Sequence, residues 1–317
     1  MIQETTNCSF CGRKTPAARG TCLYCGAALH VASIEVAASQ HSIESSEPAF
    51  NVVLLPQEIG AVDRTEAALA TALSMEPEEA KAFVSVRNAL PIARTLTRPE
   101  AELIATLVKS CGLGAIVCED RDLMLETDLI RARRVIVGED ALEVHSSAGA
   151  LKVALSQIRL IVAGMIRNQR TDFTEGVSSA RGKEGAVLET YEYQSELCLM
   201  DIYGPTLRES FRICSDGFDY SGLVHPLAYR SELNFQAAAA KLAEEAPLAT
   251  FDDGYGQVRR LLSRAWPVRT HRQSLGLKRT GAALNLVAQS SLVSDNREQF
   301  DRYSRLRYVL QERRPAV

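Results

Sequence analysis

Hydrophobic and polar positions over residues 50–119 predict a small domain of three strands and three helices. Residues 50–54 form a short apolar run typical of a buried strand, and a second such run ends at Cys118. Between them, apolar residues recur at helical spacing behind polar residues that can cap a helix N-terminus. We therefore expect the order β-α-α-β-α-β. The capping residues that predict the three helix starts are Asp63, Ser74 and Thr97.

From about residue 129 the hydrophobic period changes to two, which predicts strands. Three short runs separated by turns predict a meander, a longer apolar strand follows at 158–166, and further strands lie between Tyr191 and Cys214. A helix capped by Ser231 comes next. We expect a mainly antiparallel β-rich domain over residues 129–250, closed by one helix and similar in architecture to a pleckstrin-homology-like barrel. The polar stretch 167–187 is expected to be an exposed loop.

The last segment, residues 251–317, is predicted to be basic and helical. Residues 257–317 hold 13 lysines and arginines and four acidic residues, whereas the whole chain has a net charge of −3. Phe300 and Tyr303 lie among three arginines, which suits stacking and charge neutralisation of single-stranded nucleic acid. The alternative is that these aromatic residues face a core and the arginines are solvated. Trp266 is expected to anchor this segment against the β-rich domain.

Two C-x-x-C-G turns near the N-terminus carry the clearest chemistry. Four thiolates at this spacing suit a tetrahedral zinc ion, and a glycine after each pair permits the positive φ of a tight turn. Residues 1–30 are therefore predicted to form a zinc ribbon with a structural Zn²⁺; a disulfide pair or a redox dithiol are the alternatives. The polar stretch 31–49 is predicted to be a flexible linker. The predicted zinc ligands are Cys8, Cys11, Cys22 and Cys25.

Residues 50–119 resemble the C-terminal domain of the bacterial ribosomal stalk protein, whose general fold the Clp protease adaptor shares. The resemblance rests on residues 50–54, 79–84 and 96–102 and on the Cys111-Gly112 step. It implies a compact fold that holds a partner protein. The lysine-bearing factor-binding face of the stalk domain is replaced by residues 65–68, Thr-Glu-Ala-Ala, and no histidine matches that of the Clp adaptor.

Composition and motifs narrow the function further. The chain has 317 residues, 46% of them hydrophobic and 24% charged, which is ordinary for globular protein. The sequence contains no run of 18 apolar residues that would predict a membrane span, and no secretory signal is evident. We therefore expect a cytoplasmic multidomain α+β protein.

No motif of hydrolases, kinases or nucleotide-binding enzymes occurs. We therefore expect a non-enzymatic, zinc-binding adaptor or scaffold that binds another protein. The alternatives are a nucleic-acid- or ribosome-associated protein using the ribbon and the basic C-terminal segment, and an enzyme with an unrecognised site in the β-rich domain.

Overall fold

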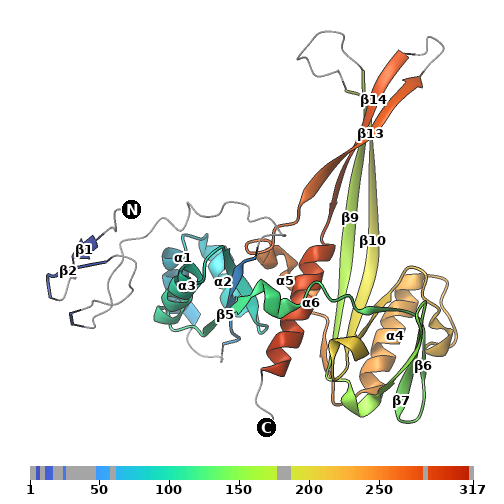
Figure 1. Cartoon of the computed structure of the whole chain (residues 1–317), viewed down its shortest axis with the longest axis horizontal. Coiled ribbons are helices and arrows are strands. Elements are labelled where there is room, and N and C mark those ends of the chain that lie inside the picture. The colour runs from blue at the N-terminus through green and yellow to red at the C-terminus, as the bar shows by residue number, and fades with distance from the viewer. Residues whose placement is uncertain are drawn as a thin grey trace. The chain divides into compact units, whose positions relative to one another are not determined.

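The chain divides into two compact units, each described by itself. The first consists of Met1–Met124 and Arg260–Trp266, and the second of Leu125–Arg259 and Pro267–Val317. Figure 1 shows the helices and strands of both. Among the described residues, no helix is long and apolar enough to cross a membrane. This computed structural model describes residues 5–7, 11–16, 24–25, 48–57, 62–176, 187–280 and 285–313.

The first unit contains the predicted order β-α-α-β-α-β, which is confirmed. Its three-stranded sheet has the order β4-β3-β5 with both pairs antiparallel, and α3 packs against all three strands. Thr97 caps α3 by accepting from the Glu100 N–H, as predicted. A separate hairpin, β1 with β2, lies near the N-terminus. The bounds are β1 Thr5–Asn7, β2 Lys14–Pro16, β3 Phe50–Leu54, α1 Val62–Ala72, α2 Pro77–Ser85, β4 Leu90–Thr95, α3 Arg98–Ser110 and β5 Ala115–Glu119.

A distant segment completes this unit, and the prediction that Trp266 packs on the β-rich domain is wrong. The Trp266 Nε1 donates to Asn51 Oδ1 at 2.8 Å, and Arg264 contacts Glu79 at 3.1 Å. Asn51 is fully buried on the central strand β3, so its side-chain amide needs partners within the protein. The indole of Trp266 supplies the donor that Asn51 Oδ1 requires.

The second unit is built on a large curled mixed sheet, so the chain is α+β with a mainly β domain. The sheet order is β13-β14-β9-β10-β11-β6-β7-β8; β12 pairs with β9, and the pairs β11–β6 and β12–β9 are parallel. The bounds are β6 Ile130–Val137, β7 Ala141–Ser146, β8 Gly149–Ala154, β9 Leu160–Gly176, β10 Val187–Tyr203, β11 Phe211–Cys214, α4 Ser231–Glu245, β12 Thr250–Asp252, α5 Tyr255–Leu262, β13 Thr270–Thr280, β14 Asn285–Asp295 and α6 Arg297–Glu312.

Two stretches of this unit form other elements than the sequence predicts. The stretch 167–187 was expected to be a loop, but β9 continues to Gly176 and β10 begins at Val187. The segment 251–317 was expected to be helical, but it contains the strands β13 and β14 between α5 and α6. Most of their described side chains are exposed or half-buried, and a period-two pattern needs one continuous buried face to be visible.

The inner halves of β9 and β10 are covered on both faces. Met200 and Ile202 belong to a core that includes Phe235 and Leu242 of α4. The alternating residue Tyr203 points to the other face, where its hydroxyl bonds Ser304 of α6. Coverage on both sides explains why residues 160–163 form an uninterrupted buried apolar run.

Candidate functional site

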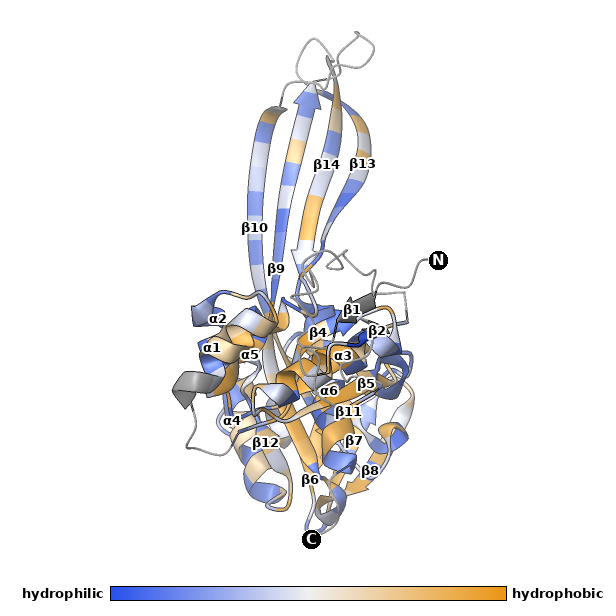
Figure 2. Cartoon of the chain, turned by 90° about the vertical axis from the view of Figure 1, so that its left-hand side faces the viewer, coloured by the Kyte–Doolittle hydropathy of each residue, from blue (hydrophilic) through white to orange (hydrophobic). Residues whose placement is uncertain are grey.

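The outer parts of four strands form a projecting sheet, here called the blade. It consists of residues 167–176 of β9, 187–197 of β10, 270–280 of β13 and 285–295 of β14. Every neighbouring pair in the order β13-β14-β9-β10 is antiparallel. No helix covers either face of the blade in Figures 1 and 2, and Figure 2 shows mostly hydrophilic to neutral positions along it. Most described side chains of the blade are therefore exposed or half-buried, and Val287 and Ser291 of β14 are the buried exceptions among them.

One face of the blade carries two neighbouring exposed tyrosines and is here called the tyrosine face. Tyr191 and Tyr193 alternate with Glu192 on β10, so both point to the same side. Their exposed fractions are 53% and 55%. The strand register places Asp172 opposite Tyr191 and Arg170 opposite Tyr193, so that polar groups lie beside the rings.

Side-chain bonds hold the strands beneath the tyrosines. Asp172 accepts from Arg170 at 2.7 Å on β9 and from the Ser291 hydroxyl at 2.5 Å on β14. These hydrogen bonds lower the pKa of Asp172, with the Arg170 bond the largest cause and the Ser291 bond the second. The charged carboxylate thus links β9 to β14 within the tyrosine face.

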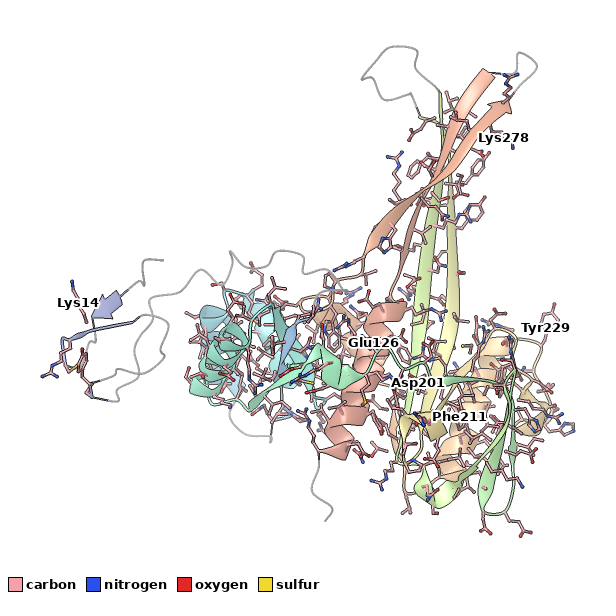
Figure 3. All side chains as sticks on the ribbon, viewed as in Figure 1. Lys14, Glu126, Asp201, Phe211, Tyr229 and Lys278 are labelled. Atoms are coloured by element: carbon pink, nitrogen blue, oxygen red, sulfur yellow. The ribbon has the colours of Figure 1, made fainter. Side chains whose placement is uncertain are left out.

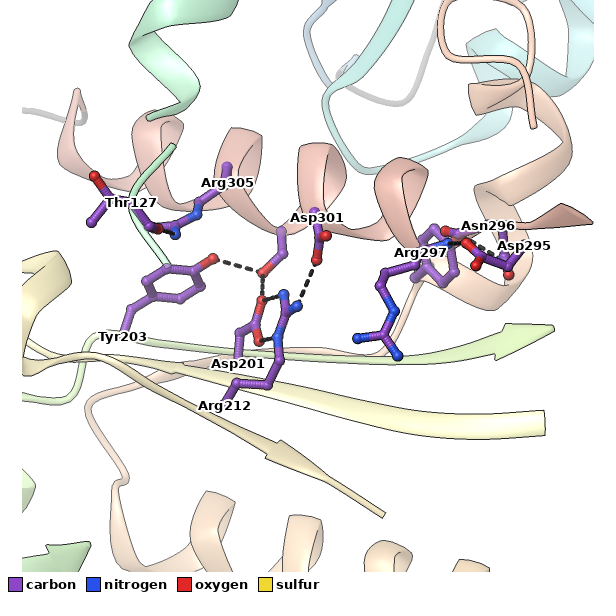
Figure 4. A network of polar contacts seen from close by, with 11 residues as sticks. Thr127, Asp201, Tyr203, Arg212, Asp295, Asn296, Arg297, Asp301 and Arg305 are labelled. Carbon is purple, nitrogen blue, oxygen red and sulfur yellow. Dashed lines mark hydrogen bonds and ion pairs between the residues drawn. The ribbon is translucent and has the colours of Figure 1, made fainter. Parts of the chain in front are cut away.

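A buried polar network fixes the base of the blade beneath α6 (Figure 4). Arg212 forms a two-bond pair with the fully buried Asp201, at 2.5 and 2.7 Å, and lies 2.7 Å from Asp301. Burial disfavours the charged form of Arg212, but Asp201 and Asp301 outweigh it and raise the pKa of this guanidinium. Ser304 joins Asp201 at 2.6 Å to the Tyr203 hydroxyl at 2.7 Å. Burial raises the pKa of the Tyr203 hydroxyl above its ordinary value, so this hydroxyl stays protonated.

Asn296 and Gly164 fasten α6 to the strand that enters the blade. Asn296 Oδ1 accepts from the backbone N–H of Arg167 at 2.7 Å, and its Nδ2 donates to the Tyr255 hydroxyl at 2.6 Å. Gly164 on β9 lets α6 approach closely, because a Cβ there would lie 2.5 Å from the Phe300 ring. The blade thus extends from a rigid, closely packed base.

Two of the four predicted zinc ligands lie among the described residues. Cys11 and Cys25 are exposed, while Cys8 and Cys22 lie outside the described residues. Cys11 lies in the connection between β1 and β2, and Gly12 has the positive φ of 68° that a tight turn requires. The Arg13 guanidinium lies 5.1 Å from the centre of the Tyr24 ring, which brings the two turns together. Each of these features fits a Cys₄ site.

The arginine-rich face of α6 is not available for stacking on nucleic acid. Phe300 and Tyr303 are fully buried, which confirms that they face a core. Arg302 and Arg305 are also buried, so the expectation of solvated arginines is wrong. Arg307 contacts Asp252 at 2.6 Å, and Arg305 donates to the Thr127 carbonyl. Arg305 and Arg307 therefore make these contacts within the second unit.

Sequence reasoning missed the blade, although one signal was present. Tyr191 and Tyr193 alternate with acidic and amide residues in Glu-Thr-Tyr-Glu-Tyr-Gln, which is a period-two pattern. The pattern predicts a strand from Tyr191 onward, but it does not reveal that this part of the strand extends beyond the helices that cover the sheet.

Comparison with protein-family models, with curated proteins and with solved structures finds no match for this chain.

Proposed function

We propose that the protein is a non-enzymatic, zinc-binding adaptor or scaffold that binds a partner protein through the tyrosine face of the blade. The observation that carries the proposal is the pair of neighbouring exposed tyrosines on an uncovered sheet face. Tyrosine combines a large apolar ring with a polar tip and few rotatable bonds, and it is enriched in binding hot spots.

The surroundings of the tyrosines favour protein binding. Asp172 and Arg170 pair with each other on the same face and can offer hydrogen bonds at the rim of a contact. Cross-strand bonds from Ser291 and the packed base keep the sheet ordered before a partner arrives. A pre-ordered surface loses little conformational entropy on binding, which favours affinity.

The remaining parts of the proposal concern the other modules. The paired strands β1 and β2, the positive φ of Gly12 and the Arg13–Tyr24 contact support a structural Zn²⁺ held by the four cysteines. The three-stranded sheet with three helices supports a stalk-like domain over residues 50–119. The curled sheet closed by α4 supports a pleckstrin-homology-like module, to which the blade is an addition.

The test is affinity capture of partners from lysate of the source cell, with and without nuclease treatment. The full chain, the Tyr191→Ala/Tyr193→Ala variant and the Tyr229→Ala variant serve as baits, and quantitative mass spectrometry compares the captured proteins. Tyr229 is a matched control because it is fully exposed on the same unit but lies beside α4, away from the blade (Figure 3). We expect a partner other than the bait, reduced about tenfold or more by the double substitution and unchanged by Tyr229→Ala.

Three outcomes contradict the proposal. One is a partner captured equally by all three baits, which would place the binding surface elsewhere. Another is capture that disappears with nuclease and falls steeply with salt, as expected of nucleic-acid or ribosome binding. The third is the absence of any partner of the parent bait.

A further inference from the structure

We propose that the two open edges of the blade pair with each other between copies of this chain, so that the outer part of β10 adds to β13 of the next copy. This inference concerns the strand edges and does not rest on partner binding by the tyrosine face. Residues 188–197 of β10 pair only with β9 among the described residues, and β13 pairs only with β14. Each edge therefore presents backbone donors and acceptors that an added strand can satisfy.

The direction of the strands suits this pairing. The four strands of the blade alternate in direction, so β10 and β13 at opposite edges run antiparallel to one another. A second copy shifted sideways by one blade width then places its β13 antiparallel to β10 of the first copy. The sheet then continues in its existing antiparallel pattern, with the second copy rotated by the normal twist between neighbouring strands.

The register identifies the side chains that meet. Glu192 pairs with Thr171, Thr171 with Leu292, and Leu292 with Arg272, so Glu192 and Arg272 lie at the same level and on the same face of the blade. The sideways shift therefore brings Glu192 of one copy opposite Arg272 of the next. The same register places Tyr191 opposite Gln273 and Tyr193 opposite His271. An acid faces a base, and each tyrosine faces a side chain that can hydrogen-bond its hydroxyl.

The charges of the two edges are complementary. The outer part of β10 contains Glu189, Glu192 and Glu196 and no lysine or arginine, whereas β13 contains Arg272, Lys278, Arg279 and no acidic residue. Pairing of β10 with β10 or of β13 with β13 would place like charges opposite each other, which destabilises a strand pair. The opposite signs therefore favour the β10–β13 contact over either symmetric contact.

Existing bonds of the edge residues do not prevent this pairing. Arg272 contacts Glu175 at 2.5 Å and Ser290 at 3.2 Å within its own chain. A guanidinium carries five N–H donors, so Arg272 can also donate to the carboxylate of Glu192 in the neighbouring copy. Among the described residues, Glu189, Glu192, Lys278 and Arg279 make no ion pair within the chain.

A contact between two different surfaces leaves one surface of each kind free after two copies have joined. Each copy that joins through β13 leaves its own β10 edge open for another, so assembly gives a ring or an extended chain of copies and not only a dimer. Because the contact includes exposed opposite charges, added salt should weaken it.

The test is analytical ultracentrifugation of the full chain and of charge-reversal variants. In Glu192→Arg both edges become basic at the contact, and in Arg272→Glu both become acidic. We expect the parent to associate with rising concentration at low salt and each variant alone to associate about tenfold more weakly. An equimolar mixture of the two variants should regain association, because each basic edge then finds an acidic one. Glu139→Arg is the matched control: this exposed residue lies in the turn between β6 and β7.

A second measurement covers the case in which Arg272→Glu disturbs its own strand. Glu192→Cys and Arg272→Cys chains of distinguishable mass are mixed and oxidised, and we expect disulfide-linked pairs containing one chain of each kind. Links between two Glu192→Cys chains or between two Arg272→Cys chains would establish a symmetric contact and overturn the proposal. A parent that stays monomeric at low salt and high concentration would also overturn it, and this result leaves capture of a different partner unaffected.

Discussion

The Trp266 indole N–H lies 2.8 Å from the side-chain oxygen of Asn51, across a sequence separation of 215 residues. The bond ties the segment Arg260–Trp266 to the central strand of the three-stranded sheet. Asn51 in turn donates to Asp120 at 2.8 Å and to the Cys118 carbonyl at 3.3 Å. The first unit is therefore completed by a segment that follows most of the second unit in the sequence.

Replacing Trp266 with Phe should destabilise the first unit. The substitution keeps an aromatic ring but leaves the Asn51 oxygen buried without its indole donor, at a cost of about 1–3 kcal/mol. Hydrogen exchange of the Asn51, Val52 and Val53 amides in β3 measures the loss. Val268→Ala is the control, because Val268 is 43% exposed and should change stability by less than about 0.5 kcal/mol. Equal protection of β3 in both variants would contradict the role of the bond.

Two glycine substitutions should have opposite effects on the second unit. Gly164→Ala places a methyl group 2.5 Å from Phe300 and 2.8 Å from Tyr255, and overpacking of this kind costs about 1–3 kcal/mol. Gly256→Ala in α5 meets nothing within 4 Å and should stabilise the helix by about 0.5–1 kcal/mol. Urea denaturation followed by circular dichroism measures both. Stabilisation by Gly164→Ala would show that α6 does not pack closely on β9.

The carboxylate of Asp172 should titrate below its ordinary pKa, and the blade should loosen in acid. The folded-state pKa is lowered by the bonds from Arg170 and Ser291, so the stabilisation is present above the unfolded pKa of about 3.9 and is lost as the pH falls through the folded value. NMR titration of the side-chain carboxyl carbon measures the pKa. Ser291→Ala should raise it, whereas Ser290→Ala, which removes the neighbouring hydroxyl on the other face, should not.

The purified protein should contain about one equivalent of zinc. Cys11→Ser/Cys25→Ser should lose it, because each substitution removes one of four thiolate ligands. Elemental analysis measures the metal, and Cys111→Ser is the control because Cys111 follows α3 and contacts the Leu107 carbonyl. Zinc should also be lost as the pH falls and the thiolates protonate. Less than about half an equivalent in the parent would contradict the site.

The order of elements in residues 50–119 was determined by the sequence itself. Capping at Thr97, apolar spacing along α3 and the buried run of β3 are local features, and local features suffice where one face of each element packs on a core. The C-x-x-C spacing of Cys8, Cys11, Cys22 and Cys25 likewise predicts a zinc site from sequence alone.

The blade, the roles of the α6 arginines and the partner of Trp266 were decided only by the tertiary structure. Strands β13 and β14 are stabilised by pairing across the sheet, and few of their described side chains are buried, so no hydrophobic period marks them. Arg302 and Arg305 have the sequence signature of a solvated or nucleic-acid-binding helix, yet both are buried in the folded unit. Whether a polar residue is exposed or buried depends on which distant groups are available to pair with it, and only the three-dimensional fold supplies those groups.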